Sequence, residues 1–275
     1  EGLMQWLHAS FGVGVTLGPL IMTGALNLFQ AWRVGYAVVG AAQLALAVAF
    51  GLSAARWKVQ PKPGDNAETH LMDYKTPLRD TLRERGAWLS IFLFFVYTGI
   101  ELTLGHWAYT LLTESRGVAP QAAGLWTGSY WATFTIGRIL AGLFTKRIGT
   151  HRLVRGSLFG ALSGAALLWW NPAPIASLIG VALVGFTIAP IFPGMVSETS
   201  LRVGPRFAAN TIGMQMSGAS LGVASIPGLV GVLAQHFSLE AIPVCLFALF
   251  AALLGLYLIS MPHKQVGQAR PAEHA

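Results

Sequence analysis

Residues 86–112 read GAWLSIFLFFVYTGIELTLGHWAYTLL, a run of 27 residues that is apolar apart from His106 and carries one acid, Glu101. A helix needs about 20 such residues to cross the hydrocarbon core of a bilayer. The stretch therefore predicts a membrane-spanning helix with a carboxyl group near its middle. An ionised side chain at that depth costs on the order of 2.5 to 3.5 kcal/mol, so Glu101 is either a working carboxyl or a neutral one bonded to a neighbouring helix.

The composition extends this interpretation to the whole chain. Hydrophobic residues make up 54% of the 275 residues and charged residues only 11%, against about 25% in ordinary globular domains. The apolar runs lack the alternation of a membrane barrel, so the expected fold is an all-α polytopic membrane protein. Eight spans are expected, at 3–28, 32–55, 86–112, 119–144, 153–170, 175–196, 208–233 and 241–261.

The basic residues predict the orientation. Fifteen of the 18 Lys and Arg residues lie on one side of the eight-span arrangement, Arg33 and Arg116 lie on the other, and Arg138 lies within a span. Positively charged loops stay on the cytoplasmic side. Both termini are therefore expected to be cytoplasmic, in a plasma membrane such as the bacterial inner membrane.

The remaining features argue against other classes of protein. The formal charge of +7 is explained by loops at the membrane face, so we expect no nucleic-acid partner. Cys245 is the single cysteine, and the sequence has no phosphate-binding loop, metal-ligand spacing or nucleophile constellation. We expect neither an enzyme nor a bound cofactor or metal.

A weak internal repeat suggests how the spans are organised. Residues 14–18 (GVTLG) resemble residues 218–222 (GASLG), so the first and seventh spans are expected to be equivalent. Transporters built from two six-helix halves have such repeats. The polar segment 58–85 then connects the halves, with residues 1–57 ending the first half, 86–262 forming the second and 263–275 a cytoplasmic tail. Four helices are expected ahead of Glu1. Within the connector, Thr76-Pro77 predicts the start of a short helix with Leu78 and Leu82 on one face.

Several motifs resemble the major facilitator superfamily, and within it the fucose permease branch of sugar:proton symporters. Residues 3–14 followed by Gly18-Pro19 resemble the fifth helix of that branch, and 97–101 with Trp107 resemble the seventh. Tyr130-Trp131 with 137–142 resemble the eighth helix, and 215–222 with Pro227 the eleventh. The resemblance covers helices five to twelve. It implies a twelve-helix fold, alternating access and a solute site between two halves, and it places several coupling carboxylates of the family in the first half, ahead of this chain.

The loop after the fourth span resembles the signature G-x-x-x-D-R-x-G-R-R of that superfamily. Residues 142–151 keep the first glycine, Arg147 and Gly149 but have Lys146 at the acidic position and Thr150 at a basic one. The charge-relay role of the missing acid is therefore not expected of Lys146.

The polar residues inside spans are the candidate site. Tyr97 shares a helical face with Glu101 and with small residues that leave room for a solute. Aromatic and amide side chains suit a sugar ring and its hydroxyl groups, and His8 is a candidate proton carrier. Interface anchoring of the aromatic side chains and helix-to-helix bonding of the amides are the alternatives. The proposed substrate and proton residues are Glu101, Tyr97, Trp131, Gln215, Asn210 and His8.

Arg138, Glu198 and Arg147 are the candidate gating residues. Arg138 either extends toward the headgroups or pairs with Glu198 in a latch at the cytoplasmic end. The glycines at 156, 160 and 164 predict close helix packing, and Pro190, Pro193 and Pro227 predict interrupted helices.

These features predict secondary transport of a small polar solute, most simply a monosaccharide, with a proton as the coupling ion and the lipid bilayer as solvent. Two alternatives remain open at this stage. One is a drug or metabolite efflux permease, and the other is a non-transporting sensor on a transporter scaffold.

Overall fold

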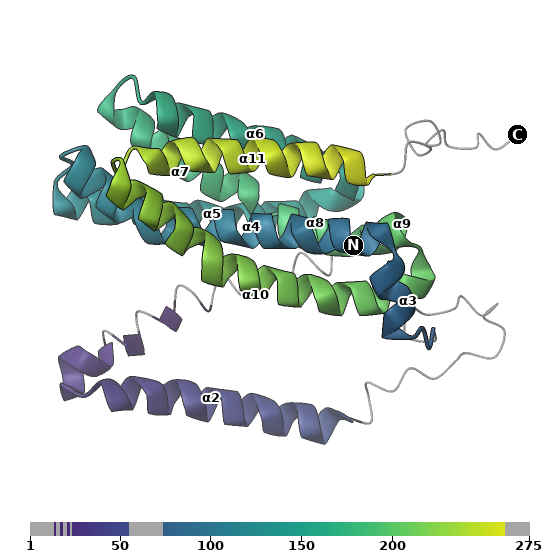
Figure 1. Ribbon diagram of the computed structural model, residues 1–275. Helices are drawn as coiled ribbons and strands as arrows, with labels where there is room; N and C mark the ends of the chain where they lie inside the picture. The colour runs from purple at the N-terminus through teal and green to yellow at the C-terminus, as the bar shows by residue number, and fades with distance from the viewer. Residues whose placement is uncertain (1–13, 15–16, 19–20, 23, 55–73, 262–275) are drawn as a thin grey trace, which may run out of the picture. The chain divides into compact units, whose positions relative to one another are not determined.

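The computed structural model describes residues 14, 17–18, 21–22, 24–54 and 74–261 (Figure 1), and all regular structure among them is helical. Most of the first predicted span and the tail lie outside these residues. The chain divides into two compact units. Helix α2 (Trp32–Ser53) belongs to one, and helices α3 to α11 belong to the other.

The second unit contains the long helices that the apolar runs predict. Helix α4 (Arg85–Thr110) continues into a π-helical turn, η2 (Leu111–Ser115), and is followed by α5 (Pro120–Ile148) and α6 (Thr150–Trp170). Helices α7 (Pro174–Ile188), α8 (Ile191–Ser197) and α9 (Thr199–Val203) come next. Helices α10 (Pro205–His236) and α11 (Ala241–Ser260) complete the unit. The expected spans from residue 32 onward are confirmed as helices, with ends that differ by a few residues.

Six helical segments among the described residues are long and apolar enough to cross a bilayer: Trp32–Ser53, Arg85–Ser115, Thr150–Trp170, Pro174–Ser197, Pro205–His236 and Ala241–Ser260. Helix α5 is also long, at 29 residues. It falls outside this set because hydroxyl side chains and Arg138 lower its hydropathy. Of the polar groups of α5, Tyr130 and Arg138 belong to the site described below.

Proline and glycine residues set the helix ends. Pro120, Pro174 and Pro205 stand in the first turn of their helices, where the missing N–H removes no hydrogen bond. Gly149 and Gly204 form the tight junctions into α6 and α10 with φ of 84° and 80°, a region that glycine enters without steric cost.

The proline predictions have two outcomes. The sixth span is interrupted at Pro190 as expected, because α7 ends at Ile188 and α8 begins at Ile191. Pro193 lies inside α8, so the expected interruption at that residue is wrong. Helix α10, in contrast, continues through Pro227 without a break, so the expected interruption of that helix is wrong. The Trp107 indole N–H donates to the Pro227 carbonyl at 3.0 Å, and this bond ties α10 to α4 at the proline.

Glycines bring the helices into close contact. Helix α10 packs along α4 and α11 packs along α6 (Figure 1). A Cβ atom at Gly222 would lie 2.0 Å from the Phe95 carbonyl oxygen, and one at Gly160 would lie 2.6 Å from the Thr187 methyl group. Gly164 packs on α7 in the same way. Gly156 does not, because a Cβ there meets nothing within 4 Å; the expectation of close packing is wrong at this position.

The expected short helix in the connector is confirmed as α3 (Leu78–Arg83), directly after Pro77. Leu78 and Leu82 are exposed, whereas Thr81 is fully buried. The reason is a polar contact with α10, because the Thr81 hydroxyl accepts a hydrogen bond from Asn210.

Candidate functional site

Glu101 lies in the middle of α4 and is only 5% exposed. Tyr97 stands one turn earlier on the same helix and is completely buried. The Tyr97 hydroxyl donates to the Ile188 carbonyl at 3.1 Å. Ile188 is the last residue of α7, where main-chain carbonyls lack partners within the helix. The interruption before Pro190 therefore supplies the acceptor that anchors Tyr97 beside Glu101.

Tyr130 of α5 completes the wall around Glu101. Its hydroxyl donates to the Glu101 main-chain carbonyl at 2.9 Å, and its ring is fully buried. Trp131 contacts the Tyr130 ring edge to face, with ring centroids 4.9 Å apart. A Cβ atom at Gly105 would lie 2.8 Å from the Trp131 ring, so glycine is what allows the indole to reach α4, one turn after Glu101.

Arg138 supplies a positive charge to the same region. It is 3% exposed, and its guanidinium lies 4.2 Å from the centre of the Phe134 ring. Its charge acts on the Glu101 carboxyl and on the hydroxyl groups of Tyr97 and Tyr130. Because Arg138 is buried, the expected extension toward the headgroups is wrong. The chain instead folds an acid and a base into one apolar interior, where charges interact strongly.

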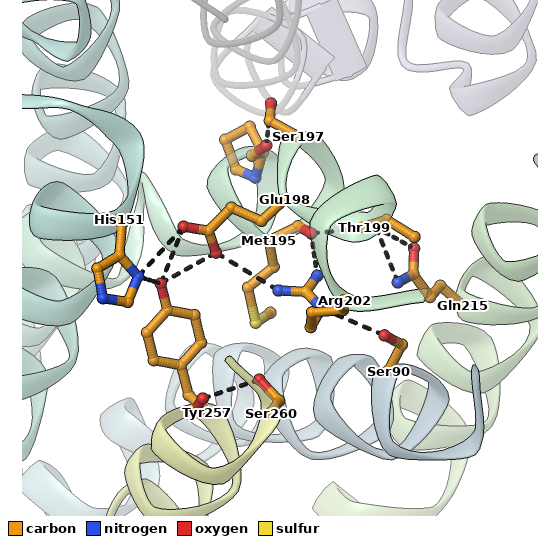
Figure 2. A network of polar contacts seen from close by, with 11 residues as sticks. Ser90, His151, Met195, Ser197, Glu198, Thr199, Arg202, Gln215, Tyr257 and Ser260 are labelled. Atoms are coloured by element: carbon orange, nitrogen blue, oxygen red, sulfur yellow. Dashed lines mark hydrogen bonds and ion pairs between the residues drawn. The ribbon is translucent and has the colours of Figure 1, made fainter. Parts of the chain in front are cut away.

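Figure 2 shows a second polar cluster, built around Glu198 at the end of α8. Its carboxyl oxygens accept hydrogen bonds of 3.0 and 2.9 Å from the Tyr257 hydroxyl of α11. The His151 Nδ1 atom lies 2.9 Å from the same hydroxyl and 3.5 Å from Glu198. Glu198 also pairs with Arg202, at 3.4 Å, and both side chains are almost completely buried. Glu198 thus has a basic partner within one turn, and the latch between Arg138 and Glu198 stays a prediction.

Arg202 connects this cluster to α4. Its Nε atom donates to the Ser90 hydroxyl at 3.2 Å, and its guanidinium also donates to the Met195 carbonyl (Figure 2). Eleven residues separate Ser90 from Glu101, which corresponds to about 16 Å along a helix. The two clusters are therefore distinct, although both contact α4.

The amide side chains belong to structural contacts rather than to the region around Glu101. Gln215 is fully buried, and its amide exchanges hydrogen bonds of 3.0 and 3.2 Å with the Thr199 hydroxyl. The Asn210 amide donates to the Thr76 carbonyl at 2.9 Å and to the Thr81 hydroxyl at 3.1 Å. Both follow the alternative of helix-to-helix bonding.

Of the two remaining predicted residues, only Arg147 is among the described residues, and it belongs to neither cluster. Arg147 is exposed in the last turn of α5. His8 lies outside the described residues.

Some members of the Glu198 cluster were absent from the sequence prediction. Arg202 follows Glu198 by four residues, the spacing of facing helical neighbours, so that signal was present. His151 occupies a basic position of the loop signature. Tyr257 is one aromatic residue in an apolar run, and nothing in its sequence context distinguishes it.

A third polar contact is built around Arg116, the residue after η2. The buried Arg116 guanidinium binds both Glu240 oxygens, at 2.9 and 2.7 Å, and donates to the Ser177 hydroxyl and the Leu168 carbonyl at 2.8 Å. It joins four chain segments. Its hydrogen bonds lower the pKa of the Glu240 carboxyl below the usual value, although partial burial opposes the shift.

The arrangement combines apolar helices of membrane length with a buried acid, a buried base and two buried tyrosines. Among the described residues, no group of His, Cys, Asp and Glu side chains could hold a metal ion. These features define an integral membrane protein with polar groups in its interior.

A family model for the Major Facilitator Superfamily matches residues 89–275, and the chain belongs to this superfamily. It is 27% identical over 296 aligned residues to the mouse "Sodium-dependent glucose transporter 1A", with 91% of this chain and 66% of that protein covered. It is 22% identical to the "Glucose/mannose transporter GlcP" of Bacillus subtilis, with 83% and 56% covered. The yeast "Bypass of stop codon protein 6" is 26% identical, with 68% and 40% covered. The chain thus spans less than two thirds of the length of these relatives.

Proposed function

We propose that the protein moves a small polar solute across the membrane by alternating access, and that Glu101 is the residue that binds the proton or the solute. The observation that carries this proposal is the burial of Glu101 at the middle of a membrane helix, beside Arg138 and two tyrosine hydroxyls. Placing a carboxyl group inside the membrane costs free energy, and such groups commonly line an ion or substrate pathway.

The chemistry of a buried acid near a fixed cation suits coupling. Ionised Glu101 balances the Arg138 charge, and protonation removes that balance while leaving a carboxyl that can donate a hydrogen bond. The two protonation states therefore favour different arrangements of α4, α5 and α7. A proton gradient acting through Glu101 would shift the protein between those arrangements.

A monosaccharide is the proposed solute. Two of the relatives carry names that refer to glucose transport. Trp131 is partly exposed beside Glu101 and has a flat aromatic face, which suits the C–H side of a sugar ring. Tyrosine and carboxyl groups suit its hydroxyls.

The remaining parts of the proposal concern organisation. Residues 1–57 would end one six-helix half and residues 86–262 would form the other, joined by 58–85. Both termini and the connector would face the cytoplasm of a plasma membrane, such as the bacterial inner membrane. This follows the fifteen basic residues on that side.

The experiment is uptake of labelled glucose, mannose and fucose into proteoliposomes that contain the protein, with and without an imposed pH gradient. The proposal expects saturable uptake of one of these sugars and accumulation above equilibrium only with the gradient. Efflux of lipophilic cations without competition by sugars would favour the efflux alternative. Sugar binding without flux would favour the sensor.

A further inference from the structure

A cavity of about 490 Å³ lies between α5, α6 and the end of α7. Its wall is formed by apolar and small residues, among them Gly137, Phe144, Gly156 and Phe186. The hydroxyl group of the wall residue Thr187 donates a 2.6 Å hydrogen bond to the Leu183 carbonyl of its own helix. Apart from Arg152 and Ser157, the wall therefore offers few polar partners.

The cavity is long and open to the surroundings of the bundle. It follows α5 from Gly137 to Ile148, which is about 16 Å along a helix. Phe144 and Phe186 on its wall are 42% and 39% exposed. These residues belong to helices that are expected to span the membrane, where an opening on the outside of the bundle would meet lipid hydrocarbon.

One end of the cavity is positively charged. Arg152, in the first turn of α6, lines that end and is exposed. No hydrogen bond or ion pair of its guanidinium is found among the described residues. Residues 115–197 contain no acidic residue, while Lys146, Arg147 and Arg155 lie close to Arg152 in the chain. The next acid along the chain, Glu198, is buried and already bonded to Tyr257 and Arg202. An anion at this end would therefore meet several basic groups.

We propose that this cavity binds an anionic phospholipid, with one acyl chain along α5 and the phosphate group at Arg152. The shape and apolar wall fit an acyl chain, and the charge fits the headgroup. Basic pockets between membrane helices are established sites for acidic lipids. The open space at Gly156 belongs to this site, which explains why this glycine makes no helix contact while Gly160 and Gly164 do. The proposal is independent of the transported solute.

Native mass spectrometry of the delipidated chain can test the site with phosphatidylglycerol, phosphatidylcholine and glycerol phosphate as probes. Wild type should bind phosphatidylglycerol more tightly than phosphatidylcholine. Arg152→Gln should weaken phosphatidylglycerol binding about fivefold and leave phosphatidylcholine binding unchanged. Arg79→Gln, an exposed change in α3, is the matched charge control and should have no effect.

Filling the cavity tests the acyl-chain part. Gly156→Leu should reduce binding of both phospholipids, whereas Gly124→Leu, at an open position of α5 outside the cavity, should not. Equal retention by the two leucine variants would overturn the proposal. So would equal binding of the two lipids by wild type, or displacement of phosphatidylglycerol by glycerol phosphate, which would indicate an anion patch alone. Loss of a dimer in Gly156→Leu with unchanged bound lipid would overturn it in favour of an interface between copies.

Discussion

The hydroxyl group of Tyr130 donates a 2.9 Å hydrogen bond to the main-chain carbonyl of Glu101. The bond joins α5 to α4 at the level of the buried carboxyl, and both residues are almost completely enclosed. It fixes the main chain at Glu101 and leaves the carboxyl group itself to respond to Tyr97 and Arg138. Tyr130 thus fixes the position of Glu101, whereas Tyr97 and Arg138 influence the protonation of its carboxyl group.

Tyr130→Phe should remove this bond and lower the free energy of unfolding by about 0.5 to 1.5 kcal/mol, the usual net worth of one hydrogen bond. The measurement is thermal or denaturant unfolding in detergent. Tyr109→Phe, at a position that is 43% exposed, is the matched control and should change little. Equal stability of the two variants would show that the Tyr130 bond contributes nothing.

The buried pair between Glu198 and Arg202 should be strongly coupled. Glu198→Gln leaves the Arg202 guanidinium buried without its carboxylate and should cost about 3 to 5 kcal/mol. Arg202→Met should cost a similar amount, whereas the double variant should lose less than the sum, because neither charge is then left alone. Additive losses in a double-mutant cycle of unfolding free energies would contradict the pairing.

Two glycines of α6 provide a paired test of packing. Gly160→Ala should destabilise the protein by about 1 to 3 kcal/mol because the new methyl group overlaps Thr187. Gly156→Ala adds a methyl group in open space and should be neutral or slightly stabilising, since alanine favours a helix. Unfolding midpoints of the two variants provide the comparison, and the reverse order would refute the helix contact.

The contact between Glu240 and Arg116 predicts a pH dependence. The folded state lowers the pKa of Glu240 below 4.5, so the contribution is complete above that value and is lost as the pH falls through the lowered pKa. The effect is at most about 1 kcal/mol because Glu240 is 44% exposed. Melting temperatures of wild type and Glu240→Gln between about pH 3 and pH 7 should converge at the acid end. A gap that stays constant over this range would contradict the assignment.

The helices could be predicted from the sequence because the length of an apolar run is a local property of the chain. The positions of residues 86–112 and 241–261 follow from composition alone, and so does the presence of Glu101 within a span. Which polar side chains meet depends on how helices rotate against one another, and periodicity does not encode that rotation. For Arg138 the sequence left two positions open, toward the headgroups or beside Glu198, and the fold places its guanidinium over the Phe134 ring.

The amide residues illustrate the same limit. Gln215 and Asn210 have the chemistry of a sugar site, but hydroxyl partners on α9 and α3 already satisfy them. Those partners lie on short helices between the spans, where sequence patterns are weakest. Only the i to i+4 spacing of Glu198 and Arg202 offered a local signal for the second cluster.

The most direct measurement of the central claim compares wild type, Glu101→Gln and Glu114→Gln in paired assays of proton-driven sugar accumulation and sugar exchange. Glutamine preserves size and hydrogen bonding but does not ionise, so Glu101→Gln should abolish accumulation and retain exchange, which needs no net proton release. Glu114→Gln, at an exposed position of η2, should behave as wild type. Accumulation by Glu101→Gln at the wild-type level would contradict the role of Glu101.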